Sequence, residues 1–460
     1  MLIALLSSTP LHAVNRGGAV SSARVHSKAS RDHRAGAHDD AIFKVCVVGA
    51  GPCGLLFSNA LLRQNADAVV EIFEREPNGG PPHDGSSGFG LGKRACDAID
   101  EVPGLLSEVE RVGTYAYLSK ARPGQAPLRT KDGLLRLSRK KLTSVMLRRL
   151  KAEHGSRVRE TFGAQCGEID FGERVLNVRL RRGGTRRVAY DLLVGADGVN
   201  SQVRQQLVAR GDVSVAHYVR PTRWKAMTLP RQPGLDPQLA LRLADPKRGV
   251  LGGVRPTHPA GYSCLVVWSE LSDNPWDAQT PAELRSRLAA TVPGLTSFDR
   301  AEVERFLARR PGREHHIMVS PAFHDHSGHV ALLGDAAHGM YSALGQGLSC
   351  GLEGAVKLAS SLASAGKDDV AAALAAYSQA AVPEAHAATQ LSTTIGHSLF
   401  GSSKPAKLVA VALLPHGGLP FFRRISDPSV PYTQLLRENR LLVWLARQVW
   451  RSERLPVEQQ

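Results

Sequence analysis

The chain has 460 residues and a mass of 49.4 kDa, which is too long for one small module if a domain takes about 150 residues. Its 43% hydrophobic and 22% charged residues exclude a disordered or fibrous protein, and no apolar run approaches the about 18 residues of a membrane-spanning helix. The formal net charge of +16 makes anionic ligands, nucleic acid, anionic lipid or an import signal worth considering. Aromatic residues, at 5%, do not interleave with the basic runs, which argues against nucleic-acid binding.

Residues 1–40 have the composition of an organelle transit peptide. They hold five basic and three acidic side chains, a net charge of +2, with no acid before Asp32 and many serines. A disordered tail is the alternative. We therefore expect a plastid or mitochondrial location, with the cytoplasm as the second possibility.

The first periodic signal predicts a βαβ unit. Phe43–Val48 is a buried-strand pattern, Leu55–Arg63 is an amphipathic helix pattern, and Val69–Glu74 is a second strand pattern. Such a unit opens a doubly wound, Rossmann-like sheet.

The loop inside this unit contains Gly49, Gly51 and Gly54 in the GxGxxG spacing. Its tight turn, the close approach of backbone to pyrophosphate and the packing of helix on strand each exclude a β-carbon. The following helix offers free N–H groups to the phosphates. Glu74, at the end of the second strand, is placed to accept hydrogen bonds from a ribose diol, so the sequence predicts a dinucleotide site.

The middle of the chain has a different pattern. Its strand-like pieces are cut by Pro, Gly and charged turns, which favours an antiparallel sheet over further βαβ units; they are Leu239–Leu243, Gly249–Val254 and Tyr262–Glu270. After Val330–Leu333 the chain is helical to about Ser392, and a last helical pattern contains Leu435, Leu436, Leu442, Leu445 and Val449. The predicted class is mixed α/β.

Three later motifs complete the pattern. Asp197-Gly198 ends the strand pattern from Asp191, Gly334-Asp335 follows another strand, and Gly345 to Glu353 opens a helix. In this order the chain resembles the flavin-dependent aromatic hydroxylases, the single-component monooxygenases of the para-hydroxybenzoate hydroxylase fold. The nearest branch is similar to kynurenine 3-monooxygenase, on the segments Leu137–Leu142, Gly334–Glu353 and Val382–Ala387.

The resemblance implies FAD as cofactor, NADPH or NADH as electron donor, and O2 as co-substrate. It implies hydroxylation of an aromatic or related small organic substrate through a flavin C4a-hydroperoxide, with no catalytic side chain assigned because the flavin carries the chemistry. Arg139 and Arg204 are expected beside phosphates. The implied cofactor-binding residues are Gly49, Gly51, Gly54, Glu74, Arg75, Gly90, Arg139, Asp197, Gly334, Asp335, Gly345, Gly347, Leu348 and Ser349.

The resemblance also divides the chain. It gives a first FAD-binding part at 41–210, within which 76–138 partly lines the substrate site, and a second part at 326–395. A substrate-domain sheet occupies 211–325, and a helical C-terminal region occupies 396–460. From the apolar alternation at Tyr262–Trp268 we expect the 211–325 sheet to form an apolar lid that excludes water.

The chain departs from the family pattern at three places. Ser342 lies in a loop where the family has Pro, and the family's Glu-Asp pair is Glu353-Gly354 here. The arginine that pairs the substrate carboxylate has no counterpart in Gly113–Ser119, which leaves Lys120 or Arg122 as substitutes.

Two other functions fit the same flavin-binding pattern. The first is a plastid epoxidase or reductase of a lipid or isoprenoid, for which the basic, amphipathic tail would contact a membrane peripherally. The second is a non-catalytic flavin-binding redox sensor. The histidines lack metal-ligand spacing and the six cysteines lack zinc or redox spacing, so we predict no metal and free, mostly buried thiols in a reduced compartment.

Overall fold

The computed structural model describes most of the chain after residue 41. The described ranges are 42–77, 88–120, 128–233, 235–236, 238–245, 250–257, 261–270, 276–292, 294–367, 369–400, 419–441 and 443–445. The predicted transit segment, Arg122, the side chain of Lys120, and the tail positions Leu442 and Val449 lie outside the described residues.

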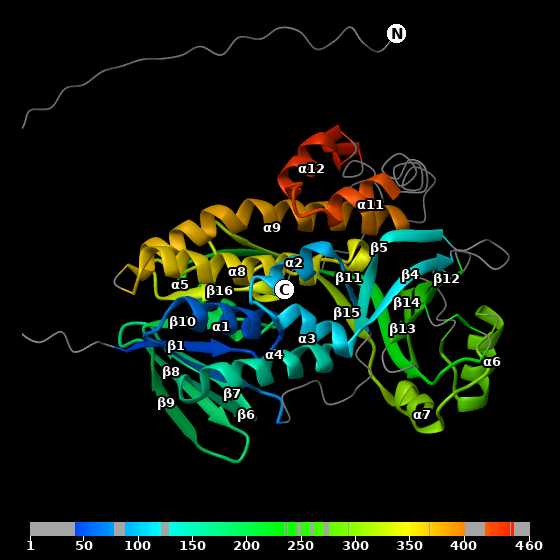
Figure 1. Cartoon of the computed structure of the whole chain (residues 1–460), viewed down its shortest axis with the longest axis horizontal. Coiled ribbons are helices and arrows are strands. Elements are labelled where there is room, and N and C mark those ends of the chain that lie inside the picture. The colour runs from blue at the N-terminus through cyan, green and yellow to red at the C-terminus, as the bar shows by residue number, and fades with distance from the viewer. Residues whose placement is uncertain are drawn as a thin grey trace, which may run out of the picture. The chain divides into compact units, whose positions relative to one another are not determined.

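A five-stranded parallel sheet forms the base of the FAD-binding part (Figure 1). Val45 in the central strand lies opposite Leu192 on one side and Val70 on the other. Strands buried on both faces are apolar nearly throughout, which explains why Val45 to Val48 are all buried. The predicted βαβ unit is confirmed. The order across the sheet is β16 (Val330–Leu332), β10 (Leu192–Gly195), β1 (Phe43–Val48), β2 (Ala68–Glu74) and β6 (Val158–Phe162).

Helices from both halves of the chain pack together over this sheet. α1 (Pro52–Gln64) contacts α4 (Arg139–His154) and α8 (Gly347–Ala365), and α8 contacts α9 (Val370–Phe400) along their lengths (Figure 1). Their buried faces share one hydrophobic core with the strands. The Gly-Asp motif and the GxGxxG loop are therefore brought to the same end of the sheet.

The second large sheet has eight strands and is antiparallel except where β12 pairs with β4. The antiparallel pairing predicted for its middle strands is confirmed. Strands encoded before the middle segment also join it. The order is β15 (Gly312–Ser320), β11 (Ser214–Leu229), β14 (Gly261–Ser269), β13 (Val250–Thr257), β12 (Leu239–Asp245), β4 (Thr114–Lys120), β5 (Leu128–Leu137) and β3 (Phe89–Leu91).

One face of the eight-stranded sheet is covered by α6 (Pro281–Thr291) and α7 (Arg300–Ala308). The alternating residues Tyr262, Cys264, Val266 and Trp268 are buried in that second core, together with Leu284 and Phe306. The expectation that this alternation forms a lid was therefore wrong. The alternation marks a helix-packed face, and Ser263, Leu265 and Val267 of the same strand point to the opposite face of the sheet.

The remaining elements complete the chain between and after the two large sheets. These elements are a three-stranded sheet, β7 (Ala164–Asp170), β8 (Val175–Leu180) and β9 (Thr185–Ala189); the helices α2 (Lys93–Asp100), α3 (Leu105–Val112), α5 (Gln202–Arg210), α11 (Leu419–Ser426) and α12 (Tyr432–Glu438); and short 3-10 turns at Gly155–Arg157, Gly334–Ala336 and Ser342–Leu344. Among the described residues, no helix is both long and apolar enough to cross a membrane.

Candidate functional site

The turn from β1 into the first turn of α1 is so tightly folded that only glycine fits at two of its positions, Gly49 and Gly54. Gly49 has a φ of +108°, and a β-carbon on it would lie 2.4 Å from the carbonyl oxygen of Ala196. A β-carbon on Gly54 would lie 2.4 Å from the carbonyl oxygen of Gly49. No side chain caps α1 at Gly51, so the first-turn N–H groups are available to an anion. The loop has the geometry that a pyrophosphate requires.

A cavity of about 370 Å³ opens beside this loop. Its lining joins segments that are up to about 290 residues apart in the chain, because three parallel strands end at this edge of the sheet. The predicted residues in the lining are Gly49, Gly51, Glu74, Arg75, Arg139, Asp197, Gly198 and Asp335.

Glu74 is fixed by the backbone at the end of β2. Its Oε2 accepts a hydrogen bond from the N–H of Ala50 at 2.9 Å, and its Oε1 accepts one from the N–H of Glu76 at 3.0 Å. A carboxylate has about four lone-pair positions, so acceptor capacity remains for two ribose hydroxyls. The side chain of Arg75 is 65% exposed and forms part of the cavity rim.

Arg139 and Asp335 lie on the walls of the same cavity. Arg139 begins α4, whose cap is Ser138, and its Nη2 would lie 3.0 Å from a β-carbon on Gly51. Asp335 lies deep in the fold but is open to the cavity, and this depth raises its pKa while Arg139 and Arg204 lower it. A guanidinium at the glycine loop fits a phosphate, and a carboxylate further in fits sugar hydroxyls.

The Asp-Gly segment contributes an acid with unused acceptor capacity. Asp197 Oδ2 accepts hydrogen bonds from the N–H groups of Gln202 and Val203, at 2.7 and 3.3 Å. Its Oδ1 is buried and has no hydrogen-bond partner within the described part of the chain. Burial raises the pKa of Asp197, and the hydrogen bonds from Ser201 and these N–H groups lower it. A ligand hydroxyl or an ordered water would satisfy the free oxygen.

Arg204 does not reach the phosphate region, so that expectation was wrong. Its side chain is buried and donates to the carbonyl oxygens of Ala336 at 3.0 Å and Val199 at 2.7 Å. Because its guanidinium is engaged by main-chain acceptors, Arg204 fastens the Asp-Gly segment to the Gly-Asp segment. It is absent from the cavity lining.

The remaining predicted residues lie outside this cavity. A β-carbon on Gly334 would lie 2.9 Å from Cys53 Sγ, and one on Gly351 would lie 2.7 Å from the same sulfur, so α8 and α1 pack closely here. Gly345 has a φ of +65° just before α8. Gly347, Leu348 and Ser349 form the first turn of α8, and Gly90 lies in β3, against the guanidinium of Arg136.

The described residues fit the adenosine, pyrophosphate and ribityl parts of FAD. The loop lacks β-carbons where a pyrophosphate needs access, Glu74 offers acceptors for a ribose, and Asp197 has a buried oxygen without a partner. Arg139 supplies the positive charge beside the phosphates.

The described cysteines and His338 lie in packed surroundings. All six cysteines are free thiols, four of them buried, as predicted. Burial lowers the pKa of His338 to about 4, and its ring lies 5.8 Å from that of Phe323. The part of the chain that the structure describes contains no group of three or more His, Cys, Asp or Glu arranged for a metal ion.

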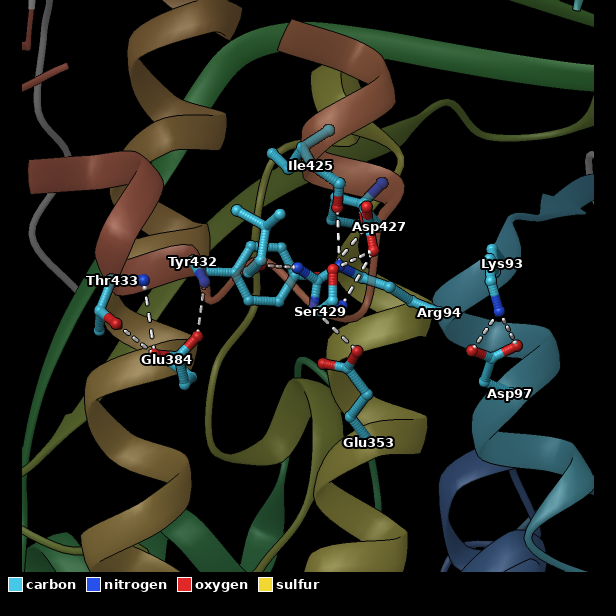
Figure 2. Close-up of polar contacts among 12 residues, drawn as sticks. Lys93, Arg94, Asp97, Glu353, Glu384, Ile425, Asp427, Ser429, Tyr432 and Thr433 are labelled. Carbon is cyan, nitrogen blue, oxygen red and sulfur yellow. Dashed lines mark hydrogen bonds and ion pairs between the residues drawn. The ribbon is translucent and has the colours of Figure 1, made fainter. Parts of the chain in front are cut away.

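A buried polar network, which the sequence analysis did not predict, joins the C-terminal helices to α8 (Figure 2). Arg94 in α2 is 4% exposed; it forms an ion pair with Glu353 at 3.0 Å and donates from Nε to the carbonyl oxygen of Ile425 at 2.7 Å. It also donates to the carbonyl oxygen of Val430, and its guanidinium lies 4.1 Å from the ring centre of Tyr432. One side chain therefore connects α2, α8 and the segment before α12.

Tyr432 carries this network to the start of α8. Its hydroxyl donates to Gln346 Oε1 at 2.9 Å, and Glu384 in α9 binds its N–H at 2.6 Å. Gln346 is the N-cap residue of α8 within the predicted Gly-Gln-Gly motif. The unusual Glu353-Gly354 and the Val382–Ala387 segment were the only sequence signals of these contacts.

The sequence profile of a family described as FAD binding domain matches residues 43–392. Among curated proteins, the chain is similar to a kynurenine 3-monooxygenase of Salinispora arenicola, with 30% identity over 87% of this chain and 92% of that protein. It is also similar to a kynurenine 3-monooxygenase of Myxococcus xanthus, with 29% identity over 68% of this chain and 69% of that protein.

Solved structures share the fold at lower identity. A p-nitrophenol 4-monooxygenase from Pseudomonas putida superposes with a TM-score of 0.66 and 21% identity, covering 84% of this chain and 97% of that one. A 2-methyl-3-hydroxypyridine-5-carboxylic acid oxygenase gives a TM-score of 0.62 and 19% identity, covering 82% of this chain and 98% of that one.

Proposed function

This chain belongs to the FAD binding domain family, and on that premise we propose that it hydroxylates a small aromatic substrate, using NAD(P)H and O2. It is an FAD-dependent monooxygenase similar to kynurenine 3-monooxygenases.

The observation that carries the proposal is the cavity at the carboxyl ends of β1, β2 and β10. It combines a glycine loop without β-carbons, a backbone-fixed Glu74, Arg139 and the deep Asp335. These groups would hold FAD, and the bound flavin supplies the redox chemistry with NAD(P)H and O2. The family match spans both parts of the chain that build the cavity.

The chain's own residues orient the bound cofactor. In the loaded site, Glu74 would accept from the ribose, Arg139 would donate to phosphate oxygens, and Asp197 and Asp335 would accept from hydroxyl groups deeper in the cavity. The N–H of Ile317 in the eight-stranded sheet donates to the carbonyl oxygen of Gly339, after the Gly-Asp motif, at 2.8 Å, so this sheet is held next to that end of the cofactor-binding part.

We expect the purified protein to contain FAD at about one equivalent and to consume NADPH or NADH faster when its aromatic substrate is present. A panel of kynurenine, salicylate, hydroxybenzoates and quinone precursors, with oxygen uptake, peroxide and oxygenated product measured in parallel, tests this. Coupled formation of a product with one added oxygen atom supports the proposal. Absence of bound FAD, or peroxide alone with every aromatic compound, contradicts it.

We also propose that the C-terminal region contacts a membrane surface peripherally. In its support, Leu441, Trp444 and Leu445 are 65%, 54% and 39% exposed, close to Arg437 and Arg440. Apolar side chains beside basic ones favour anionic lipid. We expect flotation with anionic liposomes, and a marked loss of flotation in Leu441→Ser/Trp444→Ser. Tyr218→Ser, at another partly exposed apolar side chain, is the control, and equal flotation of the double variant would contradict the proposal.

A further inference from the structure

Two arginines occupy the face of the eight-stranded sheet that lies opposite α6 and α7. Arg136 is in β5 and Arg255 is in β13, and both are half-buried. Arg136 Nε is buried without a hydrogen-bond partner. Within the described part of the chain, neither guanidinium has an ion pair with a carboxylate.

The strand register places both side chains on this face. Val254 lies opposite Cys264, and both are in the core against α6 and α7. The next pair, Arg255 opposite Ser263, therefore points to the other side of the sheet. In β5, Leu135 and Leu137 are fully buried in the first core, so Arg136 between them points away from that core.

The sheet folds back on itself and encloses these two residues. The N–H of Gly88, just before β3, donates to Ser263 Oγ in β14 at 2.9 Å, although five pairings separate the two strands in the sheet order. A β-carbon on Gly88 would lie 3.1 Å from Thr257 in β13 and 3.5 Å from the carbonyl oxygen of Leu137 in β5. Gly88 therefore lies between the ends of β5 and β13 and next to both.

Glycines also make room for the two guanidinium groups. A β-carbon on Gly90 would lie 2.8 Å from Arg136 Cζ, and one on Gly253 would lie 3.4 Å from Arg255 Cζ. Burial, and then the charge of Arg255, lower the pKa of Arg136 to about 9. Burial lowers the pKa of Arg255 and the neighbouring Cys264 thiol raises it, but no described carboxylate opposes the shift in either arginine. Two enclosed like charges without a counter-ion create a strong demand for an anion.

We propose that Arg136 and Arg255 bind the acid group of the aromatic substrate, and that this substrate carries no ammonium group beside the acid. The inference rests on the proposed function, whose substrate class it narrows. A guanidinium fork matches the two oxygens of a carboxylate. Two cations beside which the described residues place no carboxylate repel an ammonium group, so the pair selects against an amino acid such as kynurenine.

Binding to the FAD-loaded full chain, without NAD(P)H, separates this inference from turnover. There are three probes. The first is 4-(2-aminophenyl)-4-oxobutanoate, which is kynurenine without its α-amino group. The others are the methyl ester of this acid and kynurenine itself. Dissociation constants come from flavin absorbance changes and from calorimetry. We expect the acid to bind about tenfold or more tightly than either kynurenine or the ester.

Substitution of the two arginines shows whether they bind the acid group. Arg136→Met and Arg255→Met are each expected to weaken binding of the acid about tenfold or more and to leave the ester unchanged. The control Arg300→Met removes a guanidinium whose side chain is 85% exposed, and it is expected to change neither. If the methionine variants fail to fold, Arg136→Lys and Arg255→Lys are measured instead. These variants keep the charge.

Each contrary outcome overturns the inference. These are tighter binding of kynurenine than of the acid, equal binding of acid and ester, no binding of the acid, or unchanged binding in both arginine variants. Weaker binding of NADPH but not NADH in these variants would assign the pair to a cofactor phosphate instead. If the acid binds as expected but is never oxygenated, the inference stands and the proposed function fails.

Discussion

Gly49→Ala is expected to abolish FAD binding, lowering the affinity at least about 100-fold. At a φ of +108° an alanine is strained, and its β-carbon would lie 2.4 Å from the carbonyl oxygen of Ala196. That carbonyl belongs to the residue after β10, whose own N–H donates to Val48 of β1 at 2.8 Å, so it cannot move alone. The loop itself must shift, and the pyrophosphate contacts shift with it. The measurement is the FAD content of the purified protein, followed by titration of the apoprotein with FAD.

Gly183→Ala is the matched control for Gly49→Ala. Gly183 has a φ of +97°, close to that of Gly49, but a β-carbon there would meet nothing within 4 Å. It therefore carries the backbone strain, about 1–2 kcal/mol, without the collision. We expect slightly lower thermal stability and full FAD content. Normal FAD affinity in Gly49→Ala would show that the loop does not hold the cofactor as described.

Arg94→Met is expected to lower the free energy of unfolding by about 3–5 kcal/mol and to release the C-terminal helices from α8. The substitution removes a buried cation that binds Glu353, Ile425 and Val430 and lies against Tyr432. Glu353, whose side chain is 18% exposed, would be left in a partly buried position without its partner. Urea unfolding and the rate of tryptic cleavage between residues 419 and 441 are the measurements.

The same variant has a pH signature. Burial raises the pKa of Glu353, and Arg94 lowers it, so removal of Arg94 raises that pKa further. An acid with a raised pKa in the folded state binds a proton more readily when folded, so the stability deficit of Arg94→Met shrinks as pH falls through that pKa. Arg94→Met/Glu353→Gln should accordingly recover part of the lost stability near neutral pH.

Two neighbouring positions show whether the effect belongs to the network. Lys93→Met removes an exposed lysine whose ammonium binds Asp97 at 2.7 Å, and the substitution is expected to cost less than about 0.5 kcal/mol. Tyr432→Phe keeps the ring against Arg94 and loses the hydrogen bond to Gln346, for about 1 kcal/mol. Equal stability of Arg94→Met and Lys93→Met would contradict the role given to Arg94.

The sequence predicts the FAD-binding part well because its signals are local. A strand, a glycine loop, a helix and an acid lie within Phe43–Glu74, and each has a steric or hydrogen-bonding reason for its residue type. Antiparallel pairing of β12, β13 and β14 was also predictable, since turns separate short strand patterns.

Contacts between distant segments were not predictable in the same way. The alternation at Tyr262–Trp268 shows that one face of a strand is apolar but not what covers that face, and α6 and α7 cover it. The Arg94–Glu353 pair joins residues 259 positions apart, and Arg204 looked like a phosphate ligand until its main-chain acceptors were placed. Charged residues leave no periodic signal in the sequence that distinguishes a residue in a ligand site from one in an internal ion pair or hydrogen bond.

The size of the Cys53 sulfur couples three positions of the chain, because these positions share one packing space. Because Gly334 and Gly351 leave space for this sulfur and for nothing larger, enlargement at any one of the three requires a compensating change at another. Position 53 lies in the first turn of α1, and positions 334 and 351 belong to motifs almost 300 residues later. Across related sequences these three sites should therefore evolve as a correlated set, and free variation at position 53 beside two constant glycines would speak against such coupling.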